Sequence, residues 1–128
     1  MLQAKDSESE CENQLRSTCQ RIASEIENGI EITKENIDEY NDDGQYEIGD
    51  MVSGFDYIKD TLDIEYRVSS KREYLSAEIL ISYGGPNIWI DTKKKAVVGA
   101  WWGDYFEVSY SEDKLGIDEA CEEIFGCV

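Results

Sequence analysis

The central part of the chain alternates apolar and polar residues with a period of two. From Leu75 to Tyr83 every second residue is apolar or aromatic, and Ser76, Glu78 and Ser82 stand between them. Such alternation is typical of a strand with two unlike faces. The same pattern recurs on either side, and it predicts an antiparallel meander. Its five strands are expected at about residues 62–68, 74–83, 87–92, 96–102 and 105–110.

Short turns join these strands. Gly84 and Gly85 suit a tight hairpin, and Pro86 suits the first residue of a strand because it has no amide to donate to a neighbour. Residues 93–95 are three lysines at which the chain turns. The Gly-Asp pair at residues 103–104 is expected to form a two-residue hairpin loop.

The N-terminal segment has the pattern of an amphipathic helix over residues 8–28. Its apolar positions recur at spacings of four, three and four, which places them on one face. These positions are Leu15, Cys19, Ile22 and Ile26. Ser7 and Glu10 are spaced as a capping box that would begin the helix, and Gly29 would end it.

Weaker signals predict three further helical segments. Thr33 can cap a short helix at about residues 34–40, although Asn36 stands where a capping box would have glutamate or glutamine. One helical turn is expected within residues 55–60. A C-terminal helix is expected at about residues 115–125, with a buried stripe formed by Ile117, Ala120, Cys121 and Ile124.

These elements predict one α+β domain over residues 1–128. Its acidic helical part comprises residues 1–60, and its sheet and C-terminal helix comprise residues 61–128. No apolar run near the N-terminus has the length of a signal peptide or a membrane span, so we expect a soluble protein of the cytoplasm.

The charge balance restricts the classes of ligand. The chain has 29 acidic and 12 basic side chains, no histidine and a net charge of −17, and residues 1–60 hold 16 of the acidic and 5 of the basic ones. Such a surface repels nucleic acid and anionic membranes, and it attracts basic protein surfaces. An acidic shell that serves only solubility is the alternative.

The sequence carries no signature of an enzyme. Without histidine there is no ordinary catalytic triad and no imidazole ligand for a metal. The Gly-Gly-Pro-Asn segment at residues 84–87 lacks the lysine of a phosphate-binding loop. The cysteines, at positions 11, 19, 121 and 127, are expected to be reduced and lack the spacing of a zinc site. We therefore expect neither catalysis nor a cofactor.

One acidic segment has the oxygen spacing of a calcium loop. It runs from Glu39 through Asn41, Asp43 and Gly44 to Asp50. Glutamate stands at the first ligand position, where aspartate is usual, and aspartate stands at the last, where a bidentate glutamate is usual. A solvated acidic loop without a cation is therefore the favoured interpretation.

Carboxylates along two helices are the candidate partner-binding groups. Spaced along helix faces and loops, they can reproduce the repeating charge of a nucleic acid backbone. The candidates are Asp38, Glu39, Asp42 and Asp43 from the second helix and its loop, and Asp118, Glu119, Glu122 and Glu123 from the last helix.

Tryptophans are the second candidate feature. Trp101 and Trp102 are adjacent in a strand, so their side chains point to opposite faces. If helices cover both faces, which is the favoured expectation, both tryptophans belong to the core. If one face is open, Trp89 and Trp102 would form an aromatic anchor for a partner. An open face would also favour a homodimer.

Three segments carry a resemblance to known proteins. They are DYIKDTLDIEYRV at residues 56–68, ISYGGPNIWIDTKKKAVVGAWWGDYFEVSY at residues 81–110, and the acidic helix IDEACEEIF at residues 117–125. In these segments the chain resembles a group of small acidic proteins encoded by prophages and mobile elements of Gram-positive and gut bacteria. The resemblance implies that the gene lies in the same genomic setting as genes for anti-restriction and anti-CRISPR proteins.

Charge and resemblance together favour one function. We expect an inhibitor of a bacterial defence nuclease, in particular an anti-CRISPR protein whose acidic surface imitates nucleic acid inside the bacterial host. The alternative is an immunity or antitoxin protein that neutralises a basic toxin enzyme. A phage structural or assembly protein whose charge serves solubility is a third reading.

Overall fold

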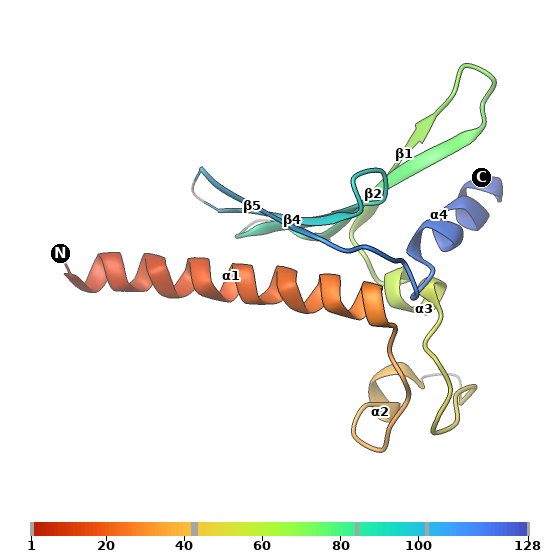
Figure 1. Ribbon diagram of the computed structural model, residues 1–128, viewed down its shortest axis with the longest axis horizontal. Coiled ribbons are helices and arrows are strands. Elements are labelled where there is room, and N and C mark those ends of the chain that lie inside the picture. Colours follow the sequence, from red (N-terminus) through yellow and green to blue (C-terminus); the bar gives the residue numbers. More distant parts are fainter. Residues whose placement is uncertain (1, 42–43, 84, 102, 128) are drawn as a thin grey trace.

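The structure is an α+β fold in which helices pack against a five-stranded sheet (Figure 1). It is a computed structural model that describes residues 2–41, 44–83, 85–101 and 103–127. The helices are α1 (Leu2–Asn28), α2 (Ile37–Tyr40), α3 (Gly54–Ile58) and α4 (Ile117–Gly126). The strands are β1 (Asp63–Val68), β2 (Tyr74–Ser82), β3 (Asn87–Asp91), β4 (Ala96–Trp101) and β5 (Asp104–Ser109).

The long helix α1 begins earlier than its sequence predicts. Ser7 lies inside the helix, so the predicted capping box is not the start. Helix-favouring residues precede Ser7, and a continuing helix supplies partners for the amides that a cap would otherwise satisfy. The C-terminal limit is confirmed, because Gly29 has a φ of 78° and its amide bonds to the carbonyl of Glu25 at 2.9 Å.

The sheet is the predicted meander, with neighbouring strands antiparallel in the order β1-β2-β3-β4-β5. Each strand boundary lies within one residue of the prediction. The last hairpin differs in one detail: Asp104 pairs with Trp101 and belongs to β5, so it is not part of the loop that was expected at residues 103–104. Gly103, with a φ of 86°, provides the left-handed conformation that this turn needs.

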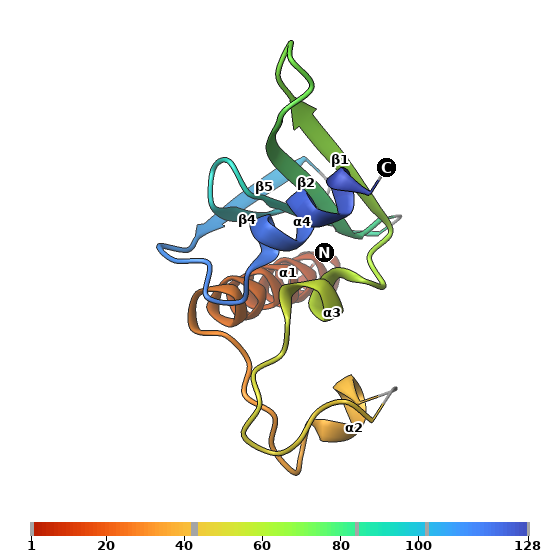
Figure 2. The same cartoon turned by 90° about the vertical axis from the view of Figure 1, so that its right-hand side faces the viewer.

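The helices of the described residues lie on one side of the sheet (Figures 1 and 2). Ile79, Ile90 and Val97 pair across the central strands and point to that side, where they join the core with residues of α1, α3 and α4. The expectation that helices cover both faces is therefore wrong. The side chains of the opposite face alternate with the core residues, and we call that surface the open face.

Two of the short segments differ from their predicted limits. The helix expected at residues 34–40 is regular only from Ile37, because residues 34–36 form a turn. The C-terminal helix begins at Ile117, two residues later than predicted. The helical turn expected within residues 55–60 is present as α3, and Ser53 caps it by accepting a hydrogen bond from the amide of Asp56.

A side chain that lies outside the C-terminal helix fixes its start. The Asp113 carboxylate accepts hydrogen bonds from the amides of Gly116, Ile117 and Asp118 at 2.8, 3.0 and 3.0 Å. These amides have no partner within the helix, so Asp113 provides the cap that a helix N-terminus requires. The predicted buried stripe is confirmed: Ile117, Ala120 and Cys121 are buried and Ile124 is half-buried.

Candidate functional site: acidic arm and open sheet face

Residues 31–41 and 44–50 project from the body of the protein as an arm that carries α2 (Figures 1 and 2). The arm leaves and re-enters the body through a narrow neck, where Ile32 donates a hydrogen bond to the carbonyl of Asp50 at 2.7 Å and accepts one from the amide of Gly49 at 2.9 Å. Ile32 and Val52 are buried in the core. The neck therefore anchors both ends of the arm.

Side-chain to backbone hydrogen bonds fix the conformation within the arm. Asn36 accepts from the amide of Thr33 at 2.8 Å, and Thr33 accepts from the amide of Asn36 at 3.3 Å. Thr33 and Asn36 therefore make both hydrogen bonds of a capping box, although asparagine stands where glutamate or glutamine is usual. Asn36 also donates to the carbonyl of Glu31, and Asn41 accepts from the amide of Tyr46.

Tyr46, in the part of the arm that returns to the body, forms hydrogen bonds with residues at the start of α3. Its phenol donates a hydrogen bond to the carboxylate of Asp56 and accepts one from the amide of Ser53 at 2.9 Å. Gln45 donates to the same carboxylate at 2.7 Å. Together with the neck, these bonds hold the arm at a defined angle to the body.

The carboxylate residues in the described part of the arm are exposed to solvent. Lys34 is the one basic residue between positions 31 and 50 of the sequence. Six carboxylate side chains in the described part of the arm are exposed, and none of them belongs to an ion pair within that part of the chain. They are Glu31, Glu35, Asp38, Glu39, Glu47 and Asp50. The predicted site residues Asp42 and Asp43 lie outside the described residues.

Two residues of the calcium-like segment use a side-chain oxygen within the protein. Asn41 accepts from Tyr46, as above, and Asp50 accepts from the amide of Glu47 at 2.8 Å. In the part of the chain that the structure describes, no group of three acidic or cysteine side chains is arranged to hold a metal ion. The described residues of this segment form part of the arm.

The predicted carboxylates of α4 divide into two kinds. Glu119, Glu122 and Glu123 are exposed along the helix. Asp118 is half-buried and accepts a hydrogen bond from the phenol of Tyr74 at 2.6 Å. Burial and this bond raise the pKa of Tyr74. Asp118 thus joins α4 to the sheet, and the three glutamates form the surface that a partner can reach.

The open face carries apolar side chains at its centre. Trp89 lies directly between Leu80 on β2 and Val98 on β4, and its ring is 6.5 Å from that of Tyr105. Trp89 and Leu80 are half-buried, and Tyr105 is 54% exposed. Trp89 therefore lies on the uncovered face of the sheet. This agrees with the alternative in which one face of the sheet is open. Trp102 lies outside the described residues.

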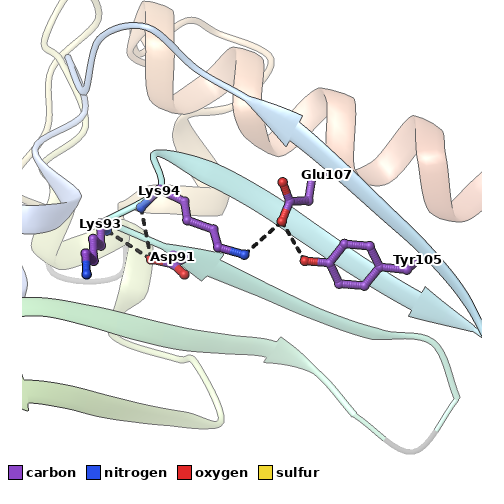
Figure 3. A network of polar contacts seen from close by, with 5 residues as sticks. All are labelled: Asp91, Lys93, Lys94, Tyr105 and Glu107. Atoms are coloured by element: carbon purple, nitrogen blue, oxygen red, sulfur yellow. Dashed lines mark hydrogen bonds and ion pairs between the residues drawn. The ribbon is translucent and has the colours of Figure 1, made fainter.

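A polar network borders this apolar patch along β5 and at the turn between β3 and β4 (Figure 3). Glu107 accepts hydrogen bonds from Lys94 at 3.0 Å and from Tyr105 at 2.5 Å. The bond from Tyr105, followed by that from Lys94, lowers the pKa of Glu107. Asp91 accepts from the amides of Lys93 and Lys94 and holds the turn between β3 and β4.

The structure does not bring the predicted site residues together. The arm and the open face point away from each other on opposite sides of the molecule, and α4 lies at one end, apart from the arm (Figures 1 and 2). Three separate surfaces result. Asp38 and Glu39 lie on the first, Glu119, Glu122 and Glu123 on the second, and Trp89 on the third.

Sequence reasoning missed several residues of the open face. Glu65 and Glu78 lie directly opposite each other on β1 and β2, and Leu80 lies opposite Trp89. The signal was present in the alternation, because these residues occupy the positions between the predicted core residues. Strand register, which alternation alone does not give, brings them side by side.

Comparison of the chain with protein-family models, with curated proteins and with solved structures gives no match. Among the described residues, no helix combines the length and the apolar character that crossing a bilayer requires. Function is therefore inferred from the surface chemistry of this chain.

Proposed function

We propose that the protein inhibits a bacterial defence nuclease, with a CRISPR effector as the first candidate, by occupying the basic surface that receives nucleic acid. Such an effector holds the guide and target strands in a positively charged channel. Carboxylates placed in that channel would replace phosphates as partners of its lysines and arginines. The partner is a basic nucleic-acid-binding protein, and DNA or RNA itself is not a ligand.

The acidic arm is the observation that carries this proposal. It presents six exposed carboxylates from one projecting segment, and no described ion pair neutralises them. Hydrogen bonds at the neck and to α3 hold the segment before a partner arrives. A preformed segment loses less conformational entropy on binding than a flexible acidic tail would.

The exposed glutamates of α4 are the second acidic surface that a basic channel could contact. Glu119, Glu122 and Glu123 stand three and four residues apart, a spacing at which like charges cost a few tenths of a kcal/mol per pair. Neutralising the arm and α4 separately distinguishes the two surfaces.

The proposal is tested with purified CRISPR effectors and restriction endonucleases and their fluorescently labelled nucleic acids. The protein should displace nucleic acid from at least one of these enzymes, as followed by fluorescence anisotropy, and its inhibition should weaken steeply as salt is raised. Failure to displace nucleic acid from any enzyme of the panel, at low salt and in excess, would contradict the proposal.

A matched pair of variants assigns the effect to the arm. Glu35→Gln, Asp38→Asn and Glu39→Gln remove three charges from the arm, while Glu73→Gln, Asp104→Asn and Glu112→Gln remove three exposed charges elsewhere. The first triple variant should lose most of the inhibition and the second should keep it. Equal losses would indicate that net charge alone is responsible.

A further inference from the structure

The open face has the composition of a covered surface at its centre. The outward positions of a solvated antiparallel sheet are usually polar. Here Leu80, Trp89 and Val98 occupy directly opposed outward positions on three successive strands, with Val98 buried and Leu80 and Trp89 half-buried. Apolar and aromatic side chains grouped in this way on an uncovered sheet mark a contact site for another molecule.

Beside this patch lies a pair of like charges. Glu65 on β1 is directly opposite Glu78 on β2, and opposed side chains on one face are about 4.5–5.5 Å apart at Cβ. Like charges in that arrangement destabilise a sheet. Arg67 points to the same side of β1, but neither glutamate belongs to an ion pair among the residues that the structure describes.

The acidic pair and the apolar patch meet in one hollow. It has a volume of about 140 Å³ and is lined by Asp63, Glu65, Glu78, Leu80 and Trp89. Its lining therefore combines an indole ring and an aliphatic side chain with three carboxylates. An arginine side chain has the complementary construction, with an apolar stem and a planar cation that stacks on aromatic rings and pairs with carboxylates.

We propose that this hollow receives an arginine side chain of a protein partner, with apolar residues beside that arginine resting on Trp89 and Tyr105. The arginine stem lies on Leu80 and Trp89, and its guanidinium group pairs with Glu65 and Glu78. The cation then relieves the repulsion between the two glutamates. This inference rests on the proposed function only in taking the partner to be basic.

Charge argues for such a partner over a second copy of this chain. Two copies that met through their open faces would add a second set of Asp63, Glu65 and Glu78 to the same interface, because a two-fold interface uses the same patch of each subunit. Each copy also has a net charge of −17. A basic partner neutralises these carboxylates, whereas a copy adds to their repulsion.

The location of the hollow separates it from the acidic arm. The residues that line the hollow lie on β1, β2 and β3, and the open face of these strands points away from the arm (Figure 1). Occupation of the hollow therefore leaves the arm accessible, and variants at one surface should not alter binding at the other. This independence allows the two proposals to fail separately.

The test uses a defined probe, the peptide acetyl-Ala-Leu-Arg-Leu-Ala-amide, and a twin in which neutral citrulline replaces arginine. Binding is followed at low salt by NMR through the indole N–H of Trp89 and the methyl groups of Leu80. The arginine peptide should shift these signals in a saturable manner, and the citrulline peptide should not. The variant Glu65→Gln/Glu78→Gln, which removes two negative charges from the hollow, should weaken binding of the arginine peptide at least about fivefold. The control Glu122→Gln/Glu123→Gln removes two negative charges from α4 and should change this binding less than about twofold.

A second pair of variants tests the apolar contribution and the integrity of the fold. Tyr105→Ser should weaken binding of the arginine peptide, whereas Phe55→Ser, at an aromatic residue of α3 that is 51% exposed, should not. The variant Glu65→Gln/Glu78→Gln should also melt at a higher temperature than the parent, because it removes a repulsive pair, so weaker binding cannot be ascribed to unfolding.

Three results would each overturn the inference. The first is that the peptide shifts signals of the arm or of α4 and leaves Trp89 unchanged. The second is that the arginine and citrulline peptides bind equally. The third is a dimer in sedimentation velocity that Trp89→Ser dissolves, which would assign the open face to a second copy. Normal nuclease inhibition by Glu65→Gln/Glu78→Gln would leave the role of the arm standing.

Discussion

Gly99 of β4 packs against Cys19 of α1, and a Cβ atom at Gly99 would stand 2.8 Å from the Cys19 sulfur. The helix can approach the sheet this closely because residue 99 has no side chain. Cys19 and its neighbour Leu15 are buried at this contact. This close approach seats α1 on one face of the sheet.

Substitution Gly99→Ala should therefore destabilise the protein by about 1–3 kcal/mol, the usual cost of adding a methyl group to a packed core. Urea unfolding followed by circular dichroism measures the change. Cys19→Ala removes the sulfur that the new methyl group would meet, so the double variant should recover part of the loss. Strictly additive effects of the two substitutions would contradict the proposed contact.

Asp113 is predicted to stabilise the start of α4. Its carboxylate accepts three backbone hydrogen bonds, so Asp113→Ala should cost about 0.5–2 kcal/mol in the free energy of unfolding. Asp113→Asn retains one acceptor oxygen and should cost less. Thermal unfolding of the three proteins compares them, and an unchanged midpoint for Asp113→Ala would exclude the capping role.

A second carboxylate predicts a pH dependence of stability. Glu27 at the end of α1 accepts hydrogen bonds from the amide and the hydroxyl of Ser111, both at 2.7 Å, and these bonds lower the pKa of Glu27 from 4.5. A carboxyl whose pKa is lower in the folded state stabilises the fold above its unfolded pKa, and this contribution is lost as the pH falls through the folded pKa.

Glu27→Gln should accordingly have a lower free energy of unfolding than the parent protein at pH 7. The difference in free energy of unfolding between the two proteins should be smaller at pH 3. Chemical unfolding at these two values avoids the region around the isoelectric point of about 4.1. Glu122→Gln removes the same charge from an exposed position and corrects for the relief of general repulsion. A difference between the two variants that does not change with pH would argue against the Ser111 contact.

The cysteines should differ in their reactivity toward iodoacetamide. Burial, with a smaller effect of Asp118, raises the pKa of Cys121 to about 12, and burial also raises the pKa of Cys19. Cys127 is exposed. At pH 8 peptide mapping should find Cys127 labelled while Cys19 and Cys121 react only after unfolding, because both the thiolate fraction and access are low. Equal labelling rates in the folded protein would contradict the burial of these two thiols.

Local patterns predicted most of the secondary structure. The alternation around Ile79 and Ile90 located the strands within one residue. Both the period of two and the turn residues are local properties of the sequence, so they can be recognised without knowing the tertiary structure. The start of α1 was misplaced because a capping box is also compatible with a helix interior. The cap from Asp113 was missed because it acts from outside the helix it begins.

Tertiary relationships limited the prediction of the candidate site. The residues Asp38 and Glu119 were correctly recognised as exposed carboxylates, but their sequence positions do not reveal that they lie on separate surfaces. The neck that turns residues 31–50 into an arm depends on hydrogen bonds between Ile32 and residues 17 and 18 positions further along the chain. The pairing of Glu65 with Glu78 depends on strand register in the same way.

The central claim is that the acidic arm and a nucleic acid compete for one basic surface. Its most direct measurement is the dissociation constant of the inhibited nuclease for its labelled nucleic acid at increasing concentrations of this protein. We predict that the apparent dissociation constant rises in proportion to the protein concentration while the binding capacity stays constant, and that the triple variant of Glu35, Asp38 and Glu39 removes most of the rise. A falling capacity at constant dissociation constant, or a ternary complex of nuclease, nucleic acid and this protein, would contradict the claim.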